Sequence, residues 1–396
     1  MKILQISSNW GRGGPGGVVK DLHYCIINNG DESVIAYGRD RIPSDISSIR
    51  IGSKFDNYVH ALFTRFFDRA GFGSTLATKK LIKMISANNP DIIHLHNLLG
   101  YYINIEVLFS FLKKYNKPVI WTIHDCWPVT GHCINFERIN CEKWVAGCYD
   151  CKLKKEYPES YFFDLSKRNW VEKREVFTGI PNMVLVCPSK WLKNIIANSF
   201  LKDYPIFVFP NGIDLTVFHP VKSNFREKYN LDDKIVLLAV AGVWNQMKGE
   251  HLLYEISTKL NENYKIVMVG KSSRKNRPKS IIYIERTNNL EELVKWYSTA
   301  DLFINPTFGD NFPTVNIEAL ACGLPIVTNN TGGSVEIAGN KFGRIVQTKT
   351  AEEFVDKIYE CVSLNISKEE CVKEARKYDK NSCFSNYLKL YDQITK

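Results

Sequence analysis

The chain has 396 residues, 44% of them hydrophobic and 24% charged, with a formal net charge of +10. This composition excludes a disordered or fibrous protein, and the length predicts two domains of similar size. No apolar run reaches the roughly 18 residues of a membrane span, and the short apolar start is typical of a first strand rather than a signal peptide, so we expect a cytoplasmic protein.

Short apolar runs alternate with helical patterns along the chain, in two series. The first series of expected strands is Ile3–Ser7, Val34–Tyr37, Ile92–His96, Pro118–Thr122, Val184–Cys187 and Phe207–Phe209. The second series is Ile235–Ala241, Lys265–Val269, Ile281–Ile284, Leu302–Asn305 and Pro325–Thr328. Helices expected between these strands include Val18–Asn28, Ile105–Tyr115, Gly249–Asn261 and Leu290–Ala300.

Strands that alternate with helices indicate parallel sheets covered on both faces. The sequence therefore predicts an α/β protein of two doubly wound Rossmann-like domains, residues 1–210 and 211–379, which face a central cleft. The turn-rich stretch Pro210–Asp214 marks the boundary. A last helix within 380–396 is expected to pack back on the first domain. Because ligands of such sheets bind at the carboxyl ends of the strands, we expect the active site in the cleft.

A glycine-rich segment, Gly11–Gly17, follows the first expected strand and precedes the first expected helix. It contains the spacing of a dinucleotide-binding loop, which by itself is a weak signal. Gly16 and Gly17 are the candidate ligand-binding residues, because we expect them to lie directly before the helix.

The basic excess is concentrated in residues 1–210, which hold 27 Lys and Arg against 19 Asp and Glu. This indicates either a solvated surface or an anionic partner, namely a membrane surface, a lipid pyrophosphate or nucleic acid. Within it, Phe55–Lys83 interleaves aromatic with basic side chains. The aromatic ones are Tyr58, Phe63, Phe66, Phe67 and Phe72, and the basic ones are Lys54, Arg65, Arg69, Lys79, Lys80 and Lys83. A helix there is expected either to lie in the headgroup plane of a membrane or to face the core as an ordinary amphipathic helix.

Three histidines lie at the ends of expected strands. His94 and His96 end one strand and are interpreted as core residues, whereas His124, which precedes Asp125, is interpreted as functional.

Four cysteines, Cys133, Cys141, Cys148 and Cys151, lie within nineteen residues of a loop without helical or strand periodicity. The Cys148-x2-Cys151 pair has the spacing of a zinc site, which predicts one structural zinc. The alternative is four thiols packed in an apolar loop, because disulfides are disfavoured in a reducing cytosol.

Lys248 follows the strand that opens the second series, and its ammonium group suits a diphosphate. Further on, Asp310 lies in a loop and can hold sugar hydroxyls. The helix start after it is formed by Asn311, Phe312, Pro313 and Thr314. Pro313 suits the first helical turn, whose N–H groups form an anion site. Glu318, one turn on, can accept two hydrogen bonds from a ribose. The alternative is a surface lysine, an acidic loop and a surface helix.

These motifs together resemble those of the family 4 retaining glycosyltransferases of GT-B fold, particularly the enzymes that build colanic acid, O-antigen and capsule. The resemblance rests on Lys248-Gly249, on Asp310-x7-Glu318, and on the stretches 319–325 and 331–336. It implies that Glu318 binds the ribose, that Asp310 contacts the donor sugar, and that Lys248 binds phosphate. It further implies that His124 contacts the donor sugar near the reacting carbon.

One position departs from the family. Val243 stands where an arginine usually shares the diphosphate charge, and Arg274, Arg277 and Arg286 are candidates to replace it.

The implied activity is transfer of a hexose-type sugar from a nucleotide-sugar donor to a lipid-linked or oligosaccharide acceptor in surface polysaccharide biosynthesis, with retention. Because the chain has no Asp-x-Asp triplet, we expect no catalytic metal. We expect the enzyme at the inner face of the membrane, with no nucleic-acid partner. The alternatives are a nucleotide-sugar epimerase of the same fold, an NAD-dependent oxidoreductase built on the glycine-rich loop, and a zinc-bearing nucleic-acid module.

Overall fold

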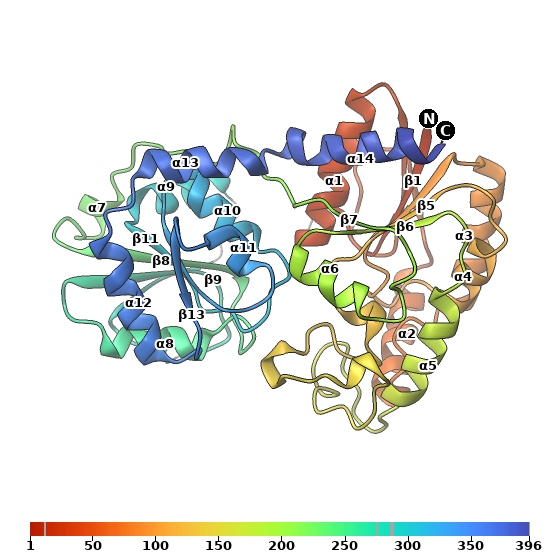
Figure 1. Cartoon of the computed structure of the whole chain (residues 1–396), viewed down its shortest axis with the longest axis horizontal. Helices are drawn as coiled ribbons and strands as arrows, with labels where there is room; N and C mark the ends of the chain where they lie inside the picture. Colours follow the sequence, from red (N-terminus) through yellow and green to blue (C-terminus); the bar gives the residue numbers. More distant parts are fainter. Residues whose placement is uncertain (12, 275, 286–288, 396) are drawn as a thin grey trace. The chain divides into compact units, whose positions relative to one another are not determined.

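The computed structural model describes residues 1–11, 13–274, 276–285 and 289–395. The chain divides into two compact units. The first unit is Met1–Pro210 together with the residues from Phe384 onward, and the second is Asn211–Cys383. Each unit is built on a parallel sheet (Figure 1).

The sheet of the first unit has seven strands in the order β3-β2-β1-β4-β5-β6-β7. Their bounds are β1 Lys2–Ser7, β2 Glu32–Tyr37, β3 Ser48–Arg50, β4 Ile92–Leu95, β5 Val119–Thr122, β6 Met183–Cys187 and β7 Ile206–Val208. The strand order reverses between β1 and β4, which lie next to each other in the sheet.

The helices of the first unit cover both faces of this sheet. They are α1 Gly13–Asn28, α2 Lys54–Phe67, α3 Thr75–Asn88, α4 Ile105–Leu112, α5 Ser166–Phe177, α6 Lys190–Ala197 and the C-terminal α14 Lys380–Thr395, with short 3-10 turns η1 Trp127–Val129, η2 Glu137–Ile139 and η3 Lys143–Val145. Helix α14 lies beside α1 (Figure 1), and Tyr387 and Tyr391 share one core cluster with Ile3, Val18 and Leu22. The C-terminal helix therefore completes the core of the first unit.

The sheet of the second unit has six strands in the order β10-β9-β8-β11-β12-β13. Their bounds are β8 Ile235–Val243, β9 Tyr264–Lys271, β10 Ile281–Ile284, β11 Leu302–Asn305, β12 Ile326–Asn329 and β13 Gly343–Val346. The helices are α7 Phe225–Lys228, α8 Glu250–Lys259, α9 Leu290–Thr299, α10 Thr314–Ala321, α11 Ser334–Ala338, α12 Ala351–Ser363 and α13 Lys368–Ala375, followed by the 3-10 turn η4 Arg376–Tyr378. The order reverses between the neighbours β8 and β11.

Alternate residues of β8 enter different cores. Leu237 and Ala239 join one cluster, whereas Val236 and Leu238 join the other, and all four side chains are buried. A strand buried on both faces needs a continuous apolar run, which is the pattern that the sequence shows here.

Two of the expected helices differ most from the structure. The segment Phe55–Lys83 forms α2 and α3 rather than one helix, because Asp68 adopts a left-handed conformation (φ 52°) that ends α2. The side chains of Arg69 and Phe72, in the turn between them, are buried and stack on each other. Helix α1 begins at Gly13 rather than near Val18. Pro15 is compatible with this start, because the N–H groups of a first helical turn have no partner within the helix and the missing N–H of proline costs nothing there.

Candidate active site

In both units, two loops follow the strands on either side of the point where the strand order reverses. Loops that follow the two strands flanking a reversal leave a crevice at the carboxyl edge of the sheet, where ligands of doubly wound folds bind. In the second unit these loops follow β8 and β11, and they carry Lys248 and Asp310. In the first unit they follow β1 and β4, and they carry the glycine-rich segment and His96.

Lys248 and Asp310 form an ion pair. The Lys248 Nζ atom donates to Asp310 Oδ2 at 2.5 Å, and both side chains remain partly exposed. The backbone N–H of Lys248 donates to Asn245 Oδ1 at 2.9 Å, which fixes the turn that carries the lysine. A cation and a carboxylate with solvent access thus lie together at the reversal of strand order between β8 and β11. The lysine suits an anionic group, and the carboxylate suits the hydroxyls of a sugar.

The loop after β8 approaches β11 closely at Gly249. Its φ is 74°, and an added Cβ would lie 2.0 Å from the carbonyl oxygen of Pro306. The Phe308 N–H donates to the Met247 carbonyl at 2.8 Å, which joins the same two loops. Only glycine permits this contact, so Gly249 is needed to bring Lys248 against the Asp310 loop.

A second glycine holds the Asp310 loop from the other side. An added Cβ at Gly332 would lie 1.7 Å from the Asp310 carbonyl, and Gly333 N–H donates to Asn311 O at 2.9 Å. Asn329, at the end of β12, donates to the carbonyls of Pro306 and Thr307, both at 3.0 Å. The Asp310 loop is therefore fixed by buried contacts.

The start of α10 differs in detail from the expectation. Pro313 is the N-cap residue rather than part of the first turn, and no side chain caps the helix there. Phe312 is buried and packs edge-on against Tyr378 at 5.9 Å, so its side chain supports the loop from the core side. Thr314, the first residue of α10, is partly exposed.

Glu318 lies one turn into α10 and accepts a hydrogen bond from the Tyr297 hydroxyl at 2.9 Å. Desolvation raises the pKa of this carboxyl to about 7, opposed by hydrogen bonds from Tyr297 and Thr314. Glu318 therefore titrates near neutral pH, and its ionised form is a strong acceptor for ligand hydroxyls. Tyr297, on α9, was not predicted, since a buried tyrosine on an amphipathic helix has no distinguishing sequence signal.

The candidate replacements for the missing arginine have different surroundings. Arg274 lies 3.7 Å from Glu250, the first residue of α8, and is half exposed. Arg277 instead stacks on the ring of Tyr283 at 3.5 Å. Arg286 lies outside the described residues. Arg274 is thus tied to the helix that directly follows Lys248-Gly249.

The three histidines of the first unit form a stacked row. The ring centroids of His94 and His96 are 4.1 Å apart, and those of His96 and His124 are 5.6 Å apart. His94 is buried and hydrogen-bonds Tyr391 at 2.7 Å and Thr122 at 2.8 Å.

His124 ends the row and, with Asp125, is only partly buried. Desolvation lowers the pKa of His124 to about 4 and raises the pKa of Asp125 to about 6. His124 is therefore neutral at physiological pH.

The glycine-rich segment is wound into the helix start. Gly16 and Gly17 both lie within α1, and the Gly16 carbonyl accepts from Gly11 N–H at 2.8 Å. An added Cβ at Gly16 would lie 3.3 Å from the Gly11 nitrogen, whereas Gly17 has open space around it. Of the two, only Gly16 is tightly packed, and a Cβ there would push the Gly11 backbone by a few tenths of an ångström. Arg12 lies outside the described residues.

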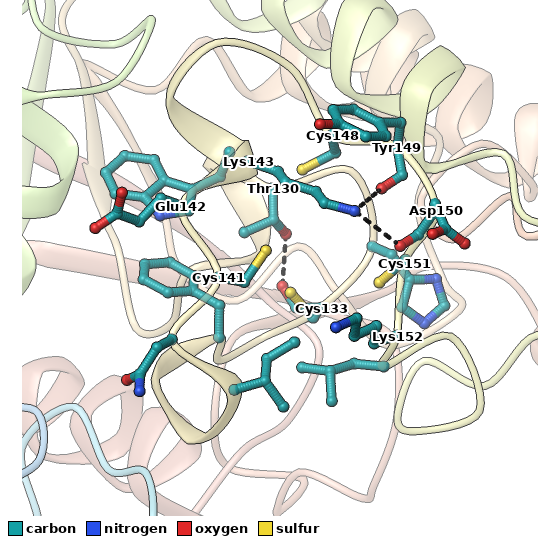
Figure 2. A pocket seen from close by; sticks show the side chains of 16 residues that line it. Thr130, Cys133, Cys141, Glu142, Lys143, Cys148, Tyr149, Asp150, Cys151 and Lys152 are labelled. Atoms are coloured by element: carbon teal, nitrogen blue, oxygen red, sulfur yellow. Dashed lines mark hydrogen bonds between the residues drawn. The ribbon is translucent and has the colours of Figure 1, made fainter.

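Cys133, Cys141, Cys148 and Cys151 line one cavity of about 210 Å³ in the first unit (Figure 2). The structure thus brings all four expected zinc ligands around one cavity.

A basic pocket on the first unit was not predicted. Its cationic residues come from the segment around β3 and from α2, and the cavity measures about 620 Å³. They are Arg39, Arg41, Arg50, Lys54 and Arg65, and the other residues that line it are Asp40, Asn57, Tyr58, Ala61 and Tyr101. Five cations with one acid give this cavity an excess of positive charge, which favours anions over cations.

Helix α2 beside this pocket turns its apolar face outward. Its exposed apolar residues follow helical spacing and are 38–73% exposed: Phe55, Tyr58, Val59, Phe63, Phe66 and Phe67. Its buried residues are instead His60 and Thr64. Phe162 and Phe163 stack on Phe66 and Phe67, at 5.4 and 6.0 Å, and extend the apolar surface. Within the residues that the structure describes, no helix is long and apolar enough to cross a membrane.

The sequence matches two family models. Residues 12–217 match Glycosyltransferase Family 4, and residues 221–378 match Glycosyl transferases group 1.

Curated relatives and solved structures agree with these matches. The putative colanic acid biosynthesis glycosyl transferase WcaC of Escherichia coli K12 is 24% identical over 376 residues, which cover 90% of this chain and 89% of that protein. The N,N'-diacetylbacillosaminyl-diphospho-undecaprenol alpha-1,3-N-acetylgalactosaminyltransferase of Campylobacter jejuni is 31% identical over 223 residues, 50% of this chain and 57% of that protein. The structure of Anabaena Alr3699/HepE in complex with UDP covers 99% of this chain and 100% of that chain, with a TM-score of 0.67 at 14% identity. The chain therefore belongs to glycosyltransferase family 4 and has two Rossmann-like units of the GT-B fold.

Proposed function

We propose that this glycosyltransferase moves a hexose-type sugar from a nucleotide-sugar donor to a lipid-linked or oligosaccharide acceptor in surface polysaccharide biosynthesis, with retention of configuration. The Lys248–Asp310 ion pair at the β8/β11 reversal carries the proposal, because it joins a phosphate-binding cation to a sugar-binding acid. The names of the relatives support the pathway class: one is assigned to colanic acid, and another acts on a diphospho-undecaprenol-linked sugar. HepE, of the same fold, was solved with UDP.

The donor site has three parts. Glu318 accepts hydrogen bonds from the ribose hydroxyls, and Lys248 with the start of α10 binds the diphosphate. Arg274 supplies the charge that Val243 lacks, since its ion pair with Glu250 holds it near the turn of Lys248. When the diphosphate binds to Lys248, the ion pair with Asp310 breaks, and the Asp310 carboxylate accepts hydrogen bonds from the hydroxyls of the donor sugar.

The chemistry follows the family expectation of front-face substitution. The bond between the anomeric carbon and the diphosphate oxygen breaks, and the acceptor oxygen forms its bond to that carbon on the same face. The acceptor proton passes to the departing diphosphate, whose negative charge Lys248 stabilises. His124 hydrogen-bonds a hydroxyl of the reacting sugar in its neutral form. This scheme needs no catalytic metal.

The acceptor side of the proposal is a membrane-bound lipid diphosphate. The outward apolar face of α2 supports insertion into the headgroup region, because burying it in lipid removes the cost of its exposure to water. The neighbouring basic pocket supports binding of an anionic headgroup. We therefore assign the enzyme to the inner face of the membrane as a peripheral protein.

The test is a donor screen with UDP-, GDP- and ADP-sugars on membranes that contain lipid-linked glycans. We expect nucleoside diphosphate and a glycosylated lipid in equal amounts, with the anomeric configuration of the donor kept in the product by NMR. Isomerised nucleotide-sugar without a glycosylated product would identify an epimerase instead. A product with the inverted anomeric configuration would still support a glycosyltransferase, but it would overturn the front-face mechanism.

A further inference from the structure

The cysteine-rich loop of the first unit takes no part in the donor chemistry. Its four cysteines lie between β5 and α5, where η2 and η3 are short 3-10 turns. The cavity that they share is lined by Cys133, Cys141, Cys148 and Cys151 (Figure 2). Apolar side chains such as Phe136 line it as well. Four thiols spaced over nineteen residues therefore meet around one space.

One of the thiols already has a contact of the kind that metal-bound thiolates use. The Gly131 N–H donates to Cys148 Sγ at 3.1 Å. Hydrogen bonds to the sulfur stabilise and orient a thiolate ligand. An added Cβ at Gly131 would lie 2.1 Å from the Ser166 carbonyl oxygen, so only glycine allows this approach.

The Cys148-x2-Cys151 turn is fixed from outside. Lys143 Nζ donates to the carbonyls of Tyr149 (3.0 Å) and Asp150 (3.2 Å), as Figure 2 shows. Cys151 N–H donates to Asp164 at 2.6 Å. The backbone of the pair is thus held in place while both side chains line the cavity.

A buried lysine fixes the start of the cysteine-rich loop. Lys173 is 1% exposed, and its Nζ donates to the carbonyls of Trp127 (2.8 Å) and Thr130 (3.0 Å). Thr130 lines the same cavity as the four cysteines, so this contact holds the backbone just before Cys133.

We propose that Cys133, Cys141, Cys148 and Cys151 bind one structural zinc ion. Among the described residues, no three His, Cys, Asp or Glu side chains yet stand in metal-binding positions. Zn–S bonds of about 2.3 Å place tetrahedral sulfurs roughly 3.8 Å apart, so ligation draws the thiols inward. The cavity that the four side chains line gives room for that movement.

The zinc has a structural role, because four protein ligands leave no open position for a substrate. It cross-links the long loop between β5 and α5, which follows His124 and Asp125 directly. Cys126 N–H donates to Ile134 O at 3.0 Å, so the ligand loop is tied to the residue after Asp125. Binding releases the thiol protons, and the affinity falls with acid.

The first experiment measures zinc by elemental analysis in the wild-type protein, purified without chelator. We expect one zinc per chain, released when a thiol reagent modifies the four cysteines. Cobalt reconstitution of the metal-free protein is expected to give the visible absorption of tetrahedral cobalt thiolate. Both readouts use the wild-type chain, so they do not depend on whether a variant folds.

Single variants then identify the ligands. Cys133→Ser, Cys141→Ser, Cys148→Ser and Cys151→Ser should each lose most of the bound zinc. Cys25→Ser is the matched control, because Cys25 is also a partly buried free cysteine but lies on α1; it should keep the full zinc content. Negligible zinc in the wild type without uptake on titration would overturn the proposal. So would disulfides among the four cysteines, or four freely titrating thiols in zinc-saturated protein.

Discussion

His96 Nδ1 lies 3.3 Å from His124 Nε2, and this contact assigns the tautomer of His124. Gln5 Nε2 donates to Ser33 Oγ at 3.2 Å, so Gln5 Oε1 accepts from His96 Nε2 at 3.1 Å. His96 Nδ1 is then an acceptor, and the proton of neutral His124 lies on Nε2. The other ring nitrogen of His124, Nδ1, is then the ring's acceptor.

His124→Ala should reduce turnover by about 100-fold, within the usual range for loss of one positioned polar group. Nucleotide affinity should stay nearly unchanged, because Lys248 and Glu318 belong to the second unit. Steady-state kinetics and calorimetry with nucleoside diphosphate measure the two effects separately. His219→Ala, at an exposed histidine, is the control. Unchanged turnover in His124→Ala would make that histidine a structural residue like His94.

Lys248→Ala should weaken nucleoside diphosphate at least about tenfold, because a hydrogen bond to a charged group contributes about 1.5–3 kcal/mol. The loss should be larger than for the nucleoside, because the unpaired Asp310 then also repels the diphosphate. Calorimetry with both ligands provides the comparison. Lys259→Ala is the control, since Lys259 pairs with Glu352 on the outer side of α8. Equal weakening of both ligands would assign Lys248 a structural role only.

The sequence could predict Lys248 and Asp310 individually, because each follows an apolar run that forms a strand. Their pairing depends on the sheet order, in which β8 and β11 are neighbours although 62 residues separate the two side chains. The edge strands β3 and β13 were missed because they contain few apolar residues: Ser48–Arg50 has only Ile49, and Gly343–Val346 has only Ile345 and Val346. The periodicity of a sequence also does not show whether the apolar side of a helix faces the core or the solvent.

Helix α2 is the clearest case in which the orientation of an apolar face could not be predicted. An amphipathic pattern has the same period whether its apolar side meets the core or the solvent. The buried His60 accepts from the N–H groups of Gly71 (3.2 Å) and Gly73 (3.1 Å), which places the polar side of α2 inward. Arg39, Arg41 and Arg50 could not be grouped in advance, because the first two lie in an irregular segment and Arg50 ends the short strand β3, and neither has a periodic signal.

Donor affinity should rise with pH through the titration of Glu318. Its folded pKa of about 7 lies above the ordinary value, so the ionised acceptor becomes fully populated only above neutral pH. We expect nucleotide binding to tighten between pH 6 and 8 in the wild type and to be weak and nearly flat in Glu318→Gln. The same raised pKa means that the contribution of Glu318 to stability is lost as pH rises from about 4.5 through 7.

Thermal melts check this second consequence. The melting temperature of Glu318→Gln minus that of the wild type should become more positive from pH 5 to pH 8. Glu352→Gln, at an exposed carboxylate on α12, should show no such trend. If the wild-type affinity does not change with pH while Glu318→Gln still binds as tightly, the ribose assignment is wrong.

Anionic vesicles should recruit the wild-type enzyme and release it when α2 loses its apolar face. Phe55→Ser/Phe66→Ser removes two exposed rings, and because both side chains face outward the fold should be retained. Arg41→Glu in the basic pocket should weaken binding to anionic vesicles while leaving the apolar face intact. Leu364→Ser is the control, an exposed apolar residue of the second unit. Sedimentation with anionic and neutral lipid measures all four proteins. Wild-type binding that does not distinguish the two lipids would refute the electrostatic part, and full binding by the double variant would refute insertion through α2.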